Sequence, residues 1–246
     1  MENGITNKSH LVWLDALRFI AAFLVLFCHS RNDFFLKYNY LPSDEQGIGA
    51  FIFYTLGRLG SEAVFVFFIL SGFLVGGKGL ERIMAGTFKL RGYAVDRFCR
   101  IMIPLCAAVT LYMVVAPIVG EKYSIWTVVG NLLSLQSIIC DSLVSPFWSL
   151  SYEVWFYIVL FALALAVRGK KIGFVLFFIC CLVYTRMNAL FLLIWLMGAV
   201  AWLCRPKRGS RWILWSSLIV IVISCGMTQM TSNSKAFSFD MPFSNM

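Results

Sequence analysis

The chain has 246 residues, of which 60% are hydrophobic and 13% are charged, and its formal net charge is +9. A soluble domain usually carries about 25% charged residues, so this composition excludes a soluble globular domain and indicates a polytopic membrane protein. The basic residues lie in short segments between apolar runs, which is typical of topology signals and leaves no soluble domain to bind nucleic acid.

Apolar runs suited to crossing a bilayer recur along the chain. A spanning helix needs about 20 mainly apolar residues. We expect an all-α fold, a polytopic transmembrane helical bundle with about seven spans within residues 1–230, followed by a polar tail over 231–246. The expected spans are residues 11–29, 50–75, 101–119, 147–167, 172–184, 189–204 and 212–226.

The topology depends on residues 123–139, an apolar run that polar side chains interrupt. Residues 78–100 hold six Lys and Arg side chains, so this segment is predicted to be cytoplasmic, with the N-terminus inside. If 123–139 does not span, the basic clusters at 168–171 and 205–211 also fall inside, as the positive-inside rule requires. We therefore expect a re-entrant or outer-surface segment between residues 120 and 146.

Two costly polar residues share one face of the first expected span. Arg18 and His29 are eleven residues apart, which places them on one helix face, about 16 Å apart along the axis. An ionisable side chain inside a membrane costs several kcal/mol and usually marks a pathway or a reaction centre. Asp15 lies three residues before Arg18 and can pair with it. Arg18 is thus predicted either to lock helix packing through Asp15 or to contact an anion or an acyl donor from the cytoplasmic side.

Three ionisable side chains fall toward the outer half of the expected bundle. They are His29, at the outer end of the first span, Glu62 in the second run and Glu153 near the outer start of the span at 147–167. A neutral imidazole with nearby carboxylates can act as a general base. The alternative is an interfacial histidine with two carboxylates that are protonated in a low dielectric.

Arg97 and Arg100 are three residues apart before the expected span at 101–119. Two arginines at this spacing share a helix face and can bind a phosphate as a fork. The alternative is an ordinary positive-inside cluster. The eight cysteines contain no C-x-x-C pattern and are typical of small apolar residues, so we predict neither a metal site nor a disulfide framework.

Four segments resemble, in order, the motifs of the acyltransferase 3 family of membrane O-acyltransferases. Residues 13–19 followed by His29 resemble its first span, and residues 68–74 resemble its second. Arg97-x-x-Arg100 with Pro104 resembles its cytoplasmic arginine motif, and residues 147–153 resemble its Trp-Ser-Leu-x-x-Glu motif.

The resemblance implies an O-acetyltransferase of the bacterial inner membrane. Acetyl-CoA would be the donor, and a hydroxyl of a cell-surface or lipid-linked carbohydrate, such as O-antigen, exopolysaccharide or peptidoglycan, would be the acceptor. His29 would be the catalytic base, Glu153 would support the histidine or the acceptor, and Arg18, Arg97 and Arg100 would engage the donor.

Two alternatives remain beside this enzyme. Embedded Arg, His and Glu side chains also suit a transporter or flippase for a lipid-linked sugar or an acyl donor. Family members usually have about ten spans, whereas about seven are expected here. We therefore expect either a short form or a chain that lacks the last spans, and a missing wall would leave an inactive member because it would admit water to the site.

Overall fold

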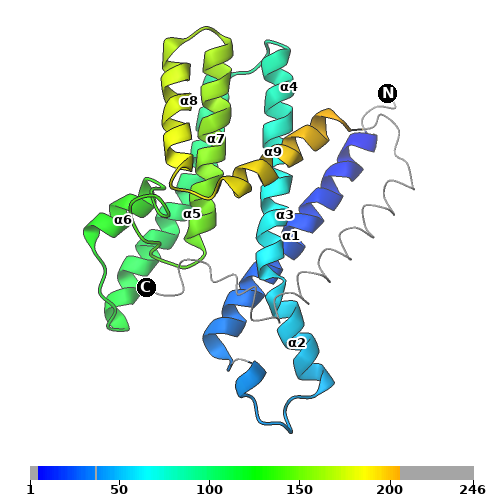
Figure 1. Cartoon of the computed structure of the whole chain (residues 1–246), viewed down its shortest axis with the longest axis vertical. Coiled ribbons are helices and arrows are strands. Elements are labelled where there is room, and N and C mark those ends of the chain that lie inside the picture. The colour runs from blue at the N-terminus through cyan, green and yellow to red at the C-terminus, as the bar shows by residue number, and fades with distance from the viewer. Residues whose placement is uncertain (1–4, 37, 206–246) are drawn as a thin grey trace. The chain divides into compact units, whose positions relative to one another are not determined.

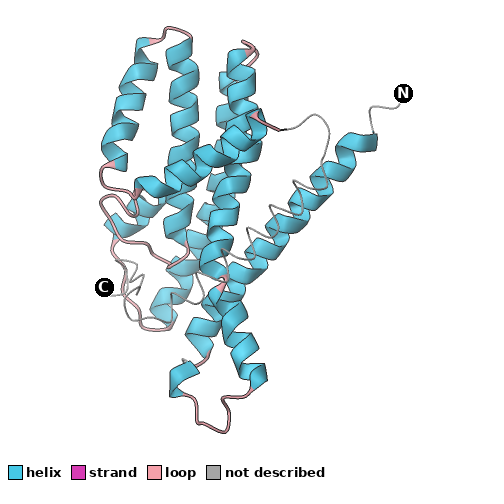
Figure 2. Cartoon of the chain, turned by 45° about the vertical axis from the view of Figure 1, so that its right-hand side comes forward, coloured by secondary structure: helices cyan, strands magenta, loops and turns pink. Residues whose placement is uncertain are grey.

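The computed structural model describes residues 5–36 and 38–205, and within these ranges the chain forms helices and loops without a β-strand (Figures 1 and 2). The all-α prediction is therefore confirmed. Among the described residues, four helical stretches are long and apolar enough to cross a membrane, at Val12–Phe34, Ile48–Met84, Leu90–Ile118 and Phe147–Val167.

The expected count of seven spans is not confirmed. Helices α8 (Lys171–Tyr184) and α9 (Ala189–Leu203) have 14 and 15 residues, which corresponds to about 21 and 22 Å at 1.5 Å per residue. Both are shorter than the hydrocarbon core of a bilayer, which is about 30 Å thick. The expected span at 212–226 lies outside the described residues. The described chain divides into two compact units, with the boundary after Phe67, and each unit is considered by itself.

Helix α1 (Ile5–Phe34) has 30 residues and belongs to the first unit. It is continuous through Arg18 and His29, which confirms that the two residues share one helix. Its last turn is attached to helix α2 (Ile48–Arg58) by Arg31, whose Nη1 donates a hydrogen bond of 3.1 Å to the backbone oxygen of Tyr54. The Arg31 guanidinium also lies 5.7 Å from the centre of the Tyr54 ring, a cation–π contact that adds to this attachment.

The second expected span, 50–75, is not one regular α-helix. Helix α2 ends at Arg58, and helix α3 (Gly60–Ser71) begins after Leu59. At Gly60 a Cβ atom would collide with the side chain of Cys28 on α1. The break between α2 and α3 therefore lies where a glycine permits α1 to approach closely. Mean hydropathy does not reveal such a local contact.

In the second unit, a π-helical segment, η2 (Gly72–Gly77), continues α3 and leads into helix α4 (Lys78–Met84). Helix α9 packs on this segment, and the backbone of Trp195 occupies the space where a side chain at Gly72 would lie. The indole of Trp195 donates a hydrogen bond of 3.3 Å to Ser71 Oγ, and both residues are buried. Small residues thus give α9 the close backbone contact that stabilises helix packing in lipid.

We expect Gly72→Ala to lower the thermal stability of the protein in detergent. The new Cβ meets the Trp195 backbone, which cannot rotate away, and such overpacking typically costs about 1–3 kcal/mol. Gly92→Ala is the matched control, because the nearest atom to a Cβ there is 3.8 Å away and alanine favours a helix. Equal melting temperatures for the two variants would show that α9 does not need this contact.

Helices α5 (Leu90–Ile118) and α7 (Phe147–Val167) are antiparallel within the second unit. Arg168 at the end of α7 donates a hydrogen bond to the backbone oxygen of Phe88, just before α5 begins. Near the opposite end of the pair, Leu105 of α5 packs with Phe147 at the start of α7. Helix α8 lies alongside α7, while α9 runs obliquely to both (Figure 1).

The segment predicted to be irregular contains only helix α6 (Ile125–Leu132), which has eight residues and is too short to span. It is followed by a loop that is held by buried polar side chains. Asn131 is fully buried, donates to the backbone oxygens of Thr127 and Asp141 at 2.8 Å, and accepts from the Leu143 amide at 3.1 Å. These bonds satisfy backbone groups that would otherwise be unpaired away from water. Whether the segment is re-entrant or lies on the outer surface stays a prediction.

Candidate functional site

His29 and Glu62 lie on neighbouring helices of the first unit. His29 directly follows Cys28, which packs against Gly60 at the start of α3, and Glu62 stands two residues further on in the first turn of that helix. Glu62 also acts electrostatically on the Cys28 thiol. Both ionisable side chains are half-buried. His29 and Glu62 therefore lie one and two residues from the point where Cys28 of α1 meets Gly60 of α3.

Arg18 lies eleven residues before His29 on α1 and forms the expected ion pair. Its Nη1 is 3.5 Å from Asp15 Oδ1, and the exposed fractions of the two side chains are 27% and 70%. A pair this exposed contributes only about 0–1 kcal/mol in water. The pairing of Arg18 with Asp15 is confirmed, while a donor contact for Arg18 stays a prediction.

Arg97 lies on a helix, as its spacing from Arg100 predicted, because α5 begins at Leu90. Its guanidinium pairs with Asp96 and sits 5.3 Å from the centre of the Tyr157 ring. The side chain is only 19% exposed. Tyr157 is near the middle of α7, so Arg97 faces the interior of this helix pair.

Glu153 belongs to the same cluster as Arg97. It lies one turn before Tyr157 on α7, and the Tyr157 hydroxyl donates a hydrogen bond to Glu153 Oε1. Tyr93 on α5 completes the group by donating a hydrogen bond of 3.3 Å to the backbone oxygen of Tyr157. The structure thus brings together two predicted site residues, Arg97 and Glu153, through a tyrosine on the same helix as the carboxylate.

Arg100 does not join this cluster. It is exposed, whereas Arg97 is half-buried, so the two guanidinium groups lie in different environments, and their joint binding of a phosphate stays a prediction. The ring of Tyr157 holds Arg97 against α7, whereas the Asp96 carboxylate pairs with it from the same helix, α5. Arg100 is therefore placed to attract an anion from solution, where salt screens the interaction.

The neighbours of Glu153 in its motif are structural. Trp148 and Tyr152 pack with Phe68 and Phe191 in one aromatic group. The Tyr152 hydroxyl accepts a hydrogen bond of 2.9 Å from the Asn188 amide, before α9. Trp148 and Tyr152 therefore lie on a packed face of α7. Glu153 lies on the face that meets α5, one turn before Tyr157.

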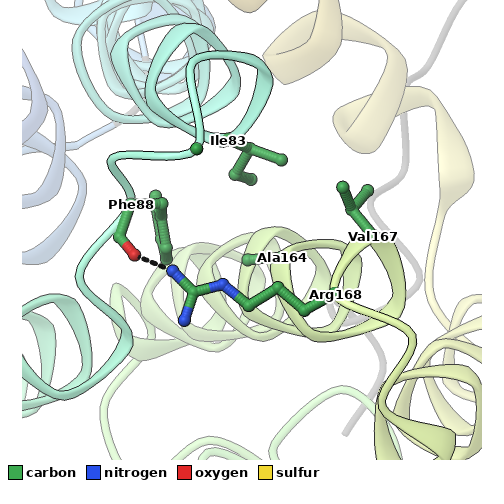
Figure 3. Close-up of a pocket in the computed structure, with 6 residues that line it drawn as sticks. Ile83, Phe88, Ala164, Val167 and Arg168 are labelled. Atoms are coloured by element: carbon green, nitrogen blue, oxygen red, sulfur yellow. Dashed lines mark hydrogen bonds between the residues drawn. The ribbon is translucent and has the colours of Figure 1, made fainter.

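A cavity of about 250 Å³ lies at the end of α7, away from the predicted site residues (Figure 3). Arg168 extends along it and bonds to the Phe88 carbonyl, while Ile83 and Val167 give it an apolar wall. Pockets for drug-sized ligands measure about 300–1,000 Å³. The cavity is too small for a whole coenzyme A molecule, and we assign it no part in the site.

The sequence interpretation missed Tyr157 and Tyr93. A signal for Tyr157 was present, since residues four apart on a helix are neighbours and Tyr157 follows Glu153 at this spacing. No comparable signal existed for Tyr93 or for its contact with α7, because the two residues are far apart in the chain.

Comparison with known proteins identifies related sequences. Residues 11–244 match a protein family described as an acyltransferase domain. The chain is 31% identical over 151 residues to the acyltransferase MdmB of Streptomyces mycarofaciens. This alignment covers 59% of the chain and 37% of the relative, which is well under two thirds of the relative's length. No solved structure matches the chain.

Proposed function

Because this chain belongs to the acyltransferase 3 family, we propose that it is an integral membrane O-acetyltransferase acting on a carbohydrate hydroxyl. The observation that carries the proposal is the family match, which extends over nearly the whole chain. The ionisable side chains on apolar helices support it, because polar groups are retained in such helices mainly for function. Acetyl-CoA is the proposed donor, and a cell-surface or lipid-linked glycan, of the O-antigen, exopolysaccharide or peptidoglycan type, is the proposed acceptor.

His29 is the proposed general base. Its imidazole takes the proton from the acceptor hydroxyl while the hydroxyl oxygen attacks the acyl carbon of the thioester. The tetrahedral intermediate then collapses, the C–S bond breaks, and the proton passes to the coenzyme A thiolate as it leaves. Glu62, on the helix that packs against α1 near His29, stabilises the transient imidazolium.

The proposed donor contacts are Arg18, Arg97 and Arg100. Arg97, in contact with Tyr157, is suited to an oxygen atom near the reacting end of the donor, because a half-buried guanidinium acts through a lower dielectric. Arg100 is exposed and is suited to the phosphates of coenzyme A. Glu153 is the proposed second carboxylate of the reaction. The proposed setting is the inner membrane of a bacterium, with the N-terminus in the cytoplasm.

Transfer of a radiolabelled acetyl group from acetyl-CoA tests this function. Membranes that contain the protein, supplied with glycan acceptor, are expected to form a labelled glycan from which mild base releases acetate, as it does from an ester. Membranes from cells without the gene are the control. A carrier would move glycan or donor across the membrane without forming this ester, so transport in the absence of labelled ester would contradict the proposal.

A further inference from the structure

Tyr157 makes two different contacts with predicted site residues. Its ring lies 5.3 Å from the Arg97 guanidinium carbon, and its hydroxyl donates to a carboxylate oxygen of Glu153. The ring and the hydroxyl thus act on residues of two different helices, α5 and α7. A phenylalanine would preserve the ring contact with Arg97 and lose the hydroxyl, which bonds to Glu153 and also acts on the guanidinium, whereas a leucine would lose both the ring and the hydroxyl.

The Arg97 guanidinium keeps unused hydrogen-bonding capacity. One of its nitrogens, Nη2, pairs with Asp96. The Nε and Nη1 atoms are buried and have no hydrogen-bond partner among the described residues. Buried donors of a charged group are costly when unpaired, so their presence points to a ligand that supplies an acceptor.

Resting on the function proposed above, we propose that Tyr157 is a positioning residue for acyl transfer. Its ring holds Arg97 so that Nε and Nη1 face an oxygen atom of the acyl donor. Its hydroxyl holds the Glu153 carboxylate in one orientation. Tyr157 touches neither substrate in this scheme and acts through the two residues that it fixes.

Two variants of Tyr157 separate these roles in steady-state kinetics of the full chain with acetyl-CoA and glycan. Tyr157→Phe is expected to lower kcat by about tenfold to a hundredfold, as the loss of a hydrogen bond to a charged group does, while the donor KM stays nearly unchanged. Tyr157→Leu is expected to lower kcat and also to raise the donor KM by about threefold to thirtyfold, the range expected for a lost cation–π contact.

Tyr123→Phe is the matched control, because it also removes a hydroxyl, one that donates a hydrogen bond of 3.3 Å to the backbone oxygen of Met113, outside the cluster around Tyr157. It is expected to change both constants by less than about threefold. A purely structural role for Tyr157 would lower the folded yield of both variants without separating kcat from KM. If Tyr157→Leu does not fold, Tyr157→Phe alone still decides, through a lower kcat at an unchanged donor KM.

The inference is overturned if Tyr157→Phe leaves kcat unchanged or raises the donor KM as much as Tyr157→Leu does. A wild-type protein that transfers no acyl group would contradict the proposed function, and this inference with it. An active wild type whose two Tyr157 variants behave alike would contradict the inference alone.

Discussion

His29→Ala is expected to lower kcat/KM for acyl transfer by about 10²–10⁴-fold, the contribution that a positioned general base usually makes. Without the imidazole, the acceptor hydroxyl must attack the thioester while it still holds its proton. The measurement is the initial rate of labelled ester formation in reconstituted membranes. His29 is half-buried at the end of an otherwise apolar stretch of α1, so alanine is expected to leave the helix intact.

The chain's other histidine, His10, provides the matched control for this experiment. His10→Ala is expected to retain the wild-type rate. In cells, the His29→Ala variant is expected to leave the glycan at the surface without its acetyl group, whereas a carrier would lose surface glycan itself. Normal acetylation by the variant would exclude His29 as the base.

Arg97→Ala is expected to raise the donor KM by about 10–150-fold, because charge-assisted hydrogen bonds contribute about 1.5–3 kcal/mol. The substitution removes the guanidinium that lies against Tyr157 and leaves the donor oxygen without a charged partner. Arg97→Lys is expected to be nearly as harmful, since lysine lacks the planar group that stacks on a ring and bonds in two directions. The measurement is the donor KM at a fixed acceptor concentration.

Arg100→Ala is the matched control, three residues away on the same helix. Its side chain is exposed, so its attraction for coenzyme A phosphates is screened. We expect a rise in donor KM of less than about fivefold, which disappears in high salt. If the two alanine variants had equal effects, the inward position of Arg97 would not matter for the donor.

The helical class was predictable from hydropathy, but the helix boundaries were not. Helix α5 begins at Leu90, eleven residues before the expected span at 101–119. Hydropathy measures what lipid tolerates, whereas a helix continues as long as its backbone bonds and neighbours allow. The end of α2 at Arg58 is the opposite case, because this helix ends inside an apolar run, next to the close approach of α1 at Gly60.

Contacts between site residues on the same helix were predictable from the sequence, whereas contacts between residues on different helices were not. Spacing along one helix correctly paired Asp15 with Arg18. The meeting of Arg97 with Tyr157 depends on the antiparallel arrangement of α5 and α7, which no local pattern encodes. The spacing of Arg97 and Arg100 predicted either a phosphate fork or a positive-inside cluster, and neither prediction included the ring of Tyr157, which Arg97 contacts.

Mass analysis of cell-surface glycans, with and without the gene, tests the central claim most directly. Cells that express the wild-type chain are expected to show glycan species heavier by the mass of one acetyl group. Cells without the gene, and cells that express only His29→Ala, are expected to lack them. Identical glycan masses in all three strains would contradict the assignment of this chain as a carbohydrate O-acetyltransferase.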